Sequence, residues 1–187
     1  PIKQRYWKKC ITKKKLENAY TEYKKFRHFL SLKKYVEAYG CISRGVYIME
    51  KLIDDVENEG ENVFTSPRLV DWKCDLCTYL NLKAVLLRKA AYCSLSISLN
   101  ERVLSILMNI YKSHFVTEKS LNTRIICEFL KCICNMIINS CMMNKYSNAL
   151  SLVPRKINYI MNDILQHPLS GIMLWIDEIA YFLYLCI

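Results

Sequence analysis

Two close cysteine pairs are the residues whose type and spacing could hold a metal ion. Cys74 and Cys77 form a C-x-x-C, and Cys132 and Cys134 form a second pair. Four thiolates can bind zinc, but compact zinc sites usually place their two pairs roughly 15 to 20 residues apart. Here 54 residues separate the pairs, and both lie within helical patterns. We therefore expect buried thiols, with no metal and no cofactor.

Catalytic residues are not indicated by any local motif. The histidines are His28, His114 and His167, and none has a second histidine at the spacing of metal ligands on one helix face. The sequence contains no G-x-S-x-G, no phosphate-binding loop and no dinucleotide fingerprint. The acidic stretch EKLIDDVENEGE at 50–61 lacks the ordered oxygen spacing of a calcium loop. These observations predict a protein that is not an enzyme and has no catalytic residues.

Phosphate binding is the chemistry that the N-terminal segment could perform. Residues 1–34 carry twelve Lys or Arg against two Glu, a net charge of +10, while the remainder carries fifteen basic and fifteen acidic residues. Basic side chains bind nucleic-acid phosphates, and aromatic residues such as Tyr6 and Trp7 can stack on bases. The candidate nucleic-acid-binding residues are Arg5, Lys8, Lys9, Lys13, Lys14, Lys15, Lys24 and Lys25. The alternative is a solvated helix face that binds no nucleic acid.

The segment GIMLWIDEIAYFLYLCI, at the C-terminal end of the sequence, is strongly apolar. Its candidate partner-binding residues are Trp175, Tyr181, Phe182 and Tyr184. A membrane-spanning helix needs about 20 apolar residues, whereas this segment is shorter and is interrupted by Asp177 and Glu178. We expect a terminal helix that packs on the preceding helices or on a continuation of the chain, because the sequence reads as a fragment of a larger protein.

Helical periodicity runs through nearly the whole chain and predicts an all-α fold of about seven helices in antiparallel pairs. Apolar residues recur every three or four positions, and no segment alternates for long enough to form a strand. The expected helices cover residues 16–30, 32–58, 67–97, 101–115, 120–143, 146–166 and 172 onward. In the second helix the predicted core stripe is Tyr35/Val36, Tyr39, Ile42, Val46, Met49, Leu52/Ile53 and Val56.

The ends of the middle helices are predicted from capping residues. Gly60 fits a C-terminal cap, and Ser66 followed by Pro67 fits the cap and first position of the third helix. Asn100 is expected to cap the fourth helix, so that the third runs unbroken to about Ile97.

The domain organisation and the cell compartment follow from composition. Residues 1–187 are expected to form a single domain, with a weak seam at 58–67. Cys127, Cys134 and Cys141 recur every seven residues in one apolar helix, where a thiol behaves as a small hydrophobic group. No secretion signal is visible, so we expect an intracellular protein of the cytoplasm or nucleus.

Two segments share a spacing that resembles the tetratricopeptide repeat. The second helix of such a repeat carries an aromatic, a small, a bulky and a small residue in turn. KKYVEAYGCISRG has this order at Tyr35, Ala38, Ile42 and Gly45. NKYSNALSLVPRK has its first three members at Tyr146, Ala149 and Val153. The resemblance covers two half-repeats and implies a divergent α-solenoid of stacked helix pairs, with an irregular helical bundle as the alternative.

Two functions are compatible with this sequence. The first is a protein–protein interaction scaffold or adaptor of an intracellular multi-subunit complex, whose partner is another protein subunit or a peptide. The second is a DNA- or RNA-binding module that uses the basic N-terminal helix. The direction of the lysines distinguishes them: one unpaired strip favours nucleic acid, and neutralisation by the acidic stretch at 50–61 favours the scaffold.

Overall fold

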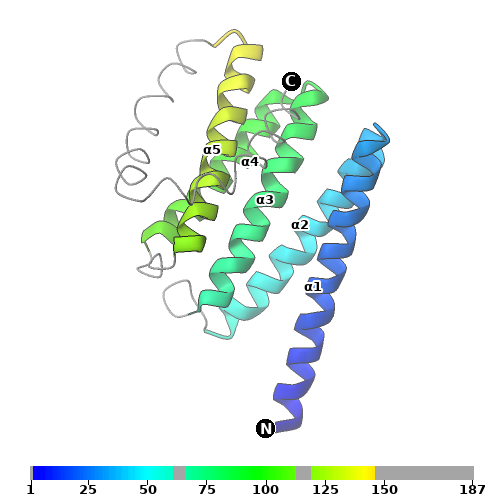
Figure 1. Cartoon of the computed structure of the whole chain (residues 1–187), viewed down its shortest axis with the longest axis vertical. Helices are drawn as coiled ribbons and strands as arrows, with labels where there is room; N and C mark the ends of the chain where they lie inside the picture. Colours follow the sequence, from blue (N-terminus) through cyan, green and yellow to red (C-terminus); the bar gives the residue numbers. More distant parts are fainter. Residues whose placement is uncertain (1, 61–65, 113–118, 146–187) are drawn as a thin grey trace. The chain divides into compact units, whose positions relative to one another are not determined.

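The computed structural model describes residues 2–60, 66–112 and 119–145, and every regular element in these ranges is an α-helix (Figure 1). The helices are α1 (Ile2–Ser31), α2 (Tyr35–Asn58), α3 (Pro67–Lys89), α4 (Cys93–Lys112) and α5 (Lys119–Met142). The predicted all-α class is confirmed. The helices expected from residue 146 onward lie outside the described residues.

The chain divides into two compact units, and the division falls inside α3. The N-terminal unit, Pro1–Tyr79, holds α1, α2 and the first half of α3. The C-terminal unit, Leu80–Ile187, holds the second half of α3 with α4 and α5. The expected seam at 58–67 includes residues 61–65, which lie outside the described residues.

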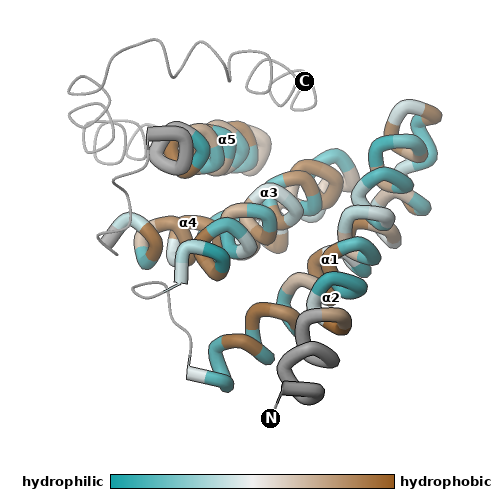
Figure 2. Tube along the Cα trace, turned by 60° about the horizontal axis from the view of Figure 1, so that its bottom comes forward, coloured by the Kyte–Doolittle hydropathy of each residue, from teal (hydrophilic) through white to brown (hydrophobic). Residues whose placement is uncertain are grey.

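The core of the N-terminal unit forms where α1 packs along α2 (Figure 1). Hydrophobic and hydrophilic residues alternate along both helices with the helical period (Figure 2). Phe26 of α1 and Ile42 and Met49 of α2 are almost completely buried. Burying each such side chain contributes roughly 1.5 to 3 kcal/mol, so this apolar seam holds the helix pair together.

Gly45 lets an aromatic ring lie directly against α2. A Cβ at this position would come within 3.2 Å of the Tyr79 ring. That ring stacks on Tyr23 with a centroid distance of 5.3 Å, and its hydroxyl donates a hydrogen bond to the Ala19 carbonyl at 3.4 Å. The ring is therefore held on two sides, and a larger residue at position 45 would have to displace it.

Two of the helix ends predicted from sequence are confirmed. Gly60 has φ of +90° and its N–H donates to the Glu57 carbonyl at 2.9 Å, as a glycine following a helix end does. Pro67 begins α3, and the Leu69 N–H points to the Ser66 hydroxyl at 3.4 Å.

The predicted boundary between the third and fourth helices is wrong. The chain turns at Ala91, which has φ of 65°, so that α3 ends at Lys89 and α4 already begins at Cys93. Asn100 lies inside α4 and is completely buried, and is not a cap. The sequence has no glycine or proline at this turn, and alanine is the best helix former. The turn therefore could not be predicted from local residue preferences.

The same turn occurs three times. Lys33, Ala91 and Asn144 follow α1, α3 and α5, and all three have left-handed backbones with φ between 56° and 65°. After each helix, the N–H of this residue bonds to the carbonyl three positions back, and the next N–H bonds to the carbonyl five positions back. This is the Schellman arrangement, which satisfies the last carbonyls of a helix and reverses the chain.

The tetratricopeptide-like pattern begins at the same distance from each left-handed turn residue. Tyr35, Ala38 and Ile42 follow Lys33 by two, five and nine positions. The same offsets from Ala91 lead to Cys93, Ser96 and Asn100 in α4. From Asn144 they lead to Tyr146, Ala149 and Val153, which lie outside the described residues. Sequence reasoning missed the middle copy because Ser96 and Asn100 are polar where the other copies carry apolar residues.

Candidate functional site

One flank of α2, next to its core side, carries large exposed side chains. We name the tyrosine face by its residues Tyr35, Val36, Tyr39 and Tyr47, which lie within roughly a third of the helix circumference. Val36 is 83% exposed and Tyr47 is 61% exposed. Tyr35, Val36 and Tyr39 were predicted to belong to the core stripe, and that prediction is wrong. The rest of the predicted stripe, from Ile42 to Val56, is buried as predicted, and the small residues Ala38, Cys41 and Gly45 complete the core side.

Gly40 lies at the edge of the tyrosine face, beside Val36 and Tyr47, and its helical backbone does not require a glycine. Its backbone is helical, and a Cβ there would meet only the guanidinium of Arg44, at 3.4 Å, among the described atoms. Glycine inside a helix costs about 0.5 to 1 kcal/mol relative to alanine. A residue that breaks a local rule without a compensating contact inside the fold is typical of a binding surface.

The charges at the two ends of α2 oppose the helix dipole. Lys33 and Lys34 directly precede the first residue, and the last turns carry Asp54, Asp55 and Glu57. Cations are unfavourable at a helix N-terminus and anions at a C-terminus, by a few tenths of a kcal/mol each.

Ion pairs within the N-terminal unit neutralise part of the acidic end of α2. Asp55 accepts a hydrogen bond from Lys15, and Glu57 forms an ion pair with Lys73. Asp54 lies 3.8 Å from the ammonium of Lys51, and both side chains are more than half exposed. Asp54 therefore remains the acid of this end that is most available to a partner.

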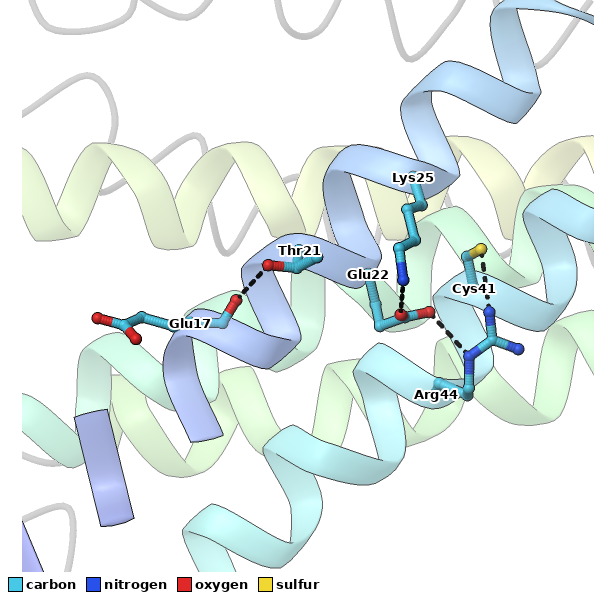
Figure 3. A network of polar contacts seen from close by, with 6 residues as sticks. All are labelled: Glu17, Thr21, Glu22, Lys25, Cys41 and Arg44. Carbon is cyan, nitrogen blue, oxygen red and sulfur yellow. Dashed lines mark hydrogen bonds and ion pairs between the residues drawn. The ribbon is translucent and has the colours of Figure 1, made fainter. Parts of the chain in front are cut away.

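A charged network joins α1 to α2 (Figure 3). Glu22 accepts hydrogen bonds from Lys25 and from Arg44, both at 2.8 Å, and Arg44 also lies 3.2 Å from the Cys41 sulfur. Burial acts to raise the pKa of Glu22, but the two hydrogen bonds and the charges of their donors outweigh it and lower the pKa. Burial raises the pKa of the Cys41 thiol.

The candidate nucleic-acid-binding lysines whose side chains are described, from Lys13 to Lys25, do not form one unpaired strip on α1. Lys15 bonds to Asp55 and Lys25 to Glu22, while Lys24 lies 4.6 Å from the centre of the Tyr20 ring. Lys13 lies 3.9 Å from Glu17, and Lys14 is exposed. Successive helical residues differ by about 100°, so Lys13, Lys14 and Lys15 point to different sides of α1. The side chains of Arg5, Lys8 and Lys9 lie outside the described residues.

A buried layer of polar side chains forms the centre of the C-terminal unit. The Asn135 amide donates to Asn100 at 2.6 Å and to the Ser96 hydroxyl at 3.2 Å, and its oxygen accepts from Arg88 at 2.9 Å. Asn139 donates to the same hydroxyl at 2.9 Å. These residues are all at most 4% exposed. Such hydrogen bonds fix one register of α4 against α5 and the second half of α3, because any slip would leave buried groups unpaired.

The polar layer continues into a buried ion pair. Glu128 accepts hydrogen bonds from Asn81 at 2.8 Å and from Lys131 at 3.0 Å. The signal in the sequence was a polar residue on every turn of an otherwise apolar helix, at Glu128, Lys131, Asn135 and Asn139, and sequence reasoning did not use it. We assign this layer to the folding of the unit, since most of its hydrogen bonds join one helix of the unit to another.

The cysteines are thiols throughout the described ranges. Cys74 and Cys77 are fully buried in α3, and Cys132 donates to the Asn100 carbonyl at 3.1 Å. Burial raises the pKa of Cys134, which disfavours the thiolate that a metal would need. Within the described residues, no three His, Cys, Asp or Glu side chains come together as metal ligands.

The predicted partner-binding residues and the prediction of no membrane span concern the C-terminal part of the chain. Trp175, Tyr181, Phe182 and Tyr184 lie outside the described residues. In the described part, Arg124–Met142 of α5 is long and apolar enough to cross a membrane by length and composition, a test that buried core helices also pass. Most of this segment is buried in the structure.

Comparison of the chain with protein-family models, with curated proteins and with solved structures yields no match.

Proposed function

We propose that this chain is a non-enzymatic protein–protein interaction scaffold of an intracellular multi-subunit complex. The observation that carries the proposal is the tyrosine face of α2. Its four residues are exposed, Val36 and Tyr47 the most, on a helix whose adjoining side is buried. Exposed apolar patches of this kind mark interaction sites, and tyrosine is enriched in protein interfaces because it joins a large apolar ring to a polar tip.

The repeated turns support a scaffold built from similar helix pairs. Lys33, Ala91 and Asn144 end three helices with the same backbone geometry and the same hydrogen bonds. We infer that the pairs are divergent repeats of the tetratricopeptide kind, in which each pair stacks on its neighbours and presents a helix face to a partner.

The alternative, binding of DNA or RNA by α1, is less well supported. Lys15 and Lys25 already bond to carboxylates of the same chain, and Lys13 to Lys15 diverge around the helix. Phosphate binding relies on unpaired cations gathered along one surface.

Affinity capture with the full chain tests the proposal. We compare the wild-type chain with Tyr47→Lys and with Tyr92→Ala, a control at a tyrosine that is also about 60% exposed. Under the proposal, a specific protein is captured by the wild type and the control, and its recovery falls at least tenfold with Tyr47→Lys. Salt-sensitive binding to DNA or RNA that is lost when Lys13, Lys14 and Lys15 are changed to Glu would contradict it.

A further inference from the structure

Two residue pairs, one within α2 and one at its ends, share one midpoint along the helix. The point midway between Gly40 and Tyr47 falls between Ser43 and Arg44, and so does the point midway between Lys33 and Asp54. In a contact with two-fold symmetry, residue i of one copy meets residue j of the other, and j meets i. A surface that is complementary about one point can therefore pair with a copy of itself.

We propose that α2 pairs with α2 of a second copy of this chain, antiparallel, across a two-fold axis between Ser43 and Arg44. This inference rests on the proposed function, in which the tyrosine face binds protein, and it names the partner of that face. Both copies contribute the same residues, so the contact closes as a dimer and leaves no further copy to add.

The shapes of the two surfaces fit in this register. Tyr47 of each copy lies over Gly40 of the other, where the ring meets no Cβ and only the flexible end of Arg44 comes near. Val36 of each copy lies opposite Lys51, whose aliphatic stem can cover it while the ammonium stays in water. The contact therefore explains why a helical glycine with no packed neighbour lies beside two exposed tyrosines.

The charges at the two ends of α2 favour the antiparallel direction. Lys33 of one copy comes opposite Asp54 of the other, on both sides of the axis, so that each unfavourable end of the helix is neutralised by its opposite. No described residue forms an ion pair with the Lys33 or Lys34 side chain, and Asp54 has only the exposed Lys51 at 3.8 Å. Parallel pairing would instead place lysine beside lysine and acid beside acid.

The contact is expected to be weak and concentration-dependent. α2 has 24 residues and is about 36 Å long at 1.5 Å per residue, and only one of its sides takes part. Stable dimers bury about 800 Å² on each partner, and smaller interfaces are typical of transient association.

Sedimentation of the full purified chain from micromolar to about millimolar concentration tests the pairing. The weight-average mass is expected to rise from monomer toward dimer. Gly40→Leu fills the space under Tyr47 while improving helix propensity, so it is expected to retain the fold and to weaken self-association at least tenfold. Tyr92→Ala is the control and leaves self-association unchanged. A mass that stays monomeric throughout, or an equal loss in the control, would overturn the inference.

A charge exchange tests the antiparallel register. Lys33→Glu and Asp54→Lys each replace both attractive pairs by repulsive ones, so each variant alone is expected to self-associate roughly tenfold more weakly. A mixture of the two variants restores attraction on both sides of the axis and forms the mixed dimer. Failure of the mixture to associate overturns the register. A monomeric chain that still captures another protein through Tyr47 overturns the second copy as partner and leaves the scaffold in place.

Discussion

Helices α2 and α4 occupy the same place after the same turn, yet they are held by different forces. Five and nine positions after the left-handed residue, α2 has Ala38 and Ile42, whereas α4 has Ser96 and Asn100. All four residues are completely buried. The first pair is held by apolar packing, which is not directional. The second pair is held by hydrogen bonds, which are directional. The same turn and helix can therefore carry either apolar or polar buried side chains, but the polar ones specify a single register of the packed helices more strictly.

The largest effect on stability is expected when the buried asparagine of α4 is placed at the equivalent position of α2. Ile42→Asn removes an apolar side chain from the core and buries an amide with no partner, so we expect a loss of about 4 to 5 kcal/mol of unfolding free energy. Urea denaturation followed by circular dichroism measures it. Val36→Asn, on the exposed face of the same helix, is the control and should change stability by less than about 0.5 kcal/mol. Similar losses in both variants would refute the assignment of the two sides of α2.

The next largest effect is expected at the centre of the polar layer. Asn135→Ala removes a hydrogen-bond partner from buried groups of Arg88, Asn100 and Ser96. The free energy of unfolding should fall by about 3 kcal/mol. Hydrogen exchange of α4 and α5 amides should accelerate, because the register bonds are lost. Asn109→Ala, at an exposed position of α4, provides the comparison and should have almost no effect. A protein that tolerates Asn135→Ala would show that packing alone holds this unit.

A smaller, pH-dependent effect is expected at Glu22. The pKa of Glu22 is lowered in the folded state. Its carboxylate therefore stabilises the fold fully above its pKa in the unfolded chain, about 4.3, and this stabilisation is lost as pH falls through the folded pKa. Glu22→Gln should lower the free energy of unfolding by about 1 kcal/mol at pH 7, with Lys25 and Arg44 half exposed, and by progressively less as pH falls through the folded pKa. Glu17→Gln on the exposed side of α1 is the matched variant. A difference that persists at low pH would exclude the ionic origin.

The smallest effects, of opposite sign, are expected at the two glycines of α2. Gly40→Ala meets no packed neighbour and should stabilise the chain by about 0.5 to 1 kcal/mol. Gly45→Ala brings a Cβ within 3.2 Å of the Tyr79 ring, which is held by Tyr23 and by Ala19, and should destabilise the chain by about 1 kcal/mol. Thermal denaturation compares them directly. Stabilisation by both substitutions would mean that the Tyr79 ring moves freely.

The candidate site was harder to predict than the fold, for a reason visible in α2. The residues Tyr35, Val36 and Tyr39 are apolar at helical spacing, so they were assigned to the core together with Ile42 and Val46. Periodicity finds a helix and placed Ile42 to Val56 correctly, but it cannot show that the first turns bury the small residues Ala38 and Cys41 in place of Tyr35, Val36 and Tyr39. The lysines of α1 were misleading in a similar way, because composition reveals charge but not the ion pair of Lys15 with Asp55.

The sequence by itself determined the all-α class, the end of α2 at Gly60 and the start of α3 at Pro67, because these depend on local backbone preferences. Only the tertiary structure decided where α3 ends. Ala91 takes a left-handed backbone that its own preference opposes, and buried bonds such as that of Ser96 to the Ala84 carbonyl hold the following helix in place. Which side of α2 is buried was likewise decided by the neighbours of that helix, since packing contacts join residues distant in the chain and leave no local pattern.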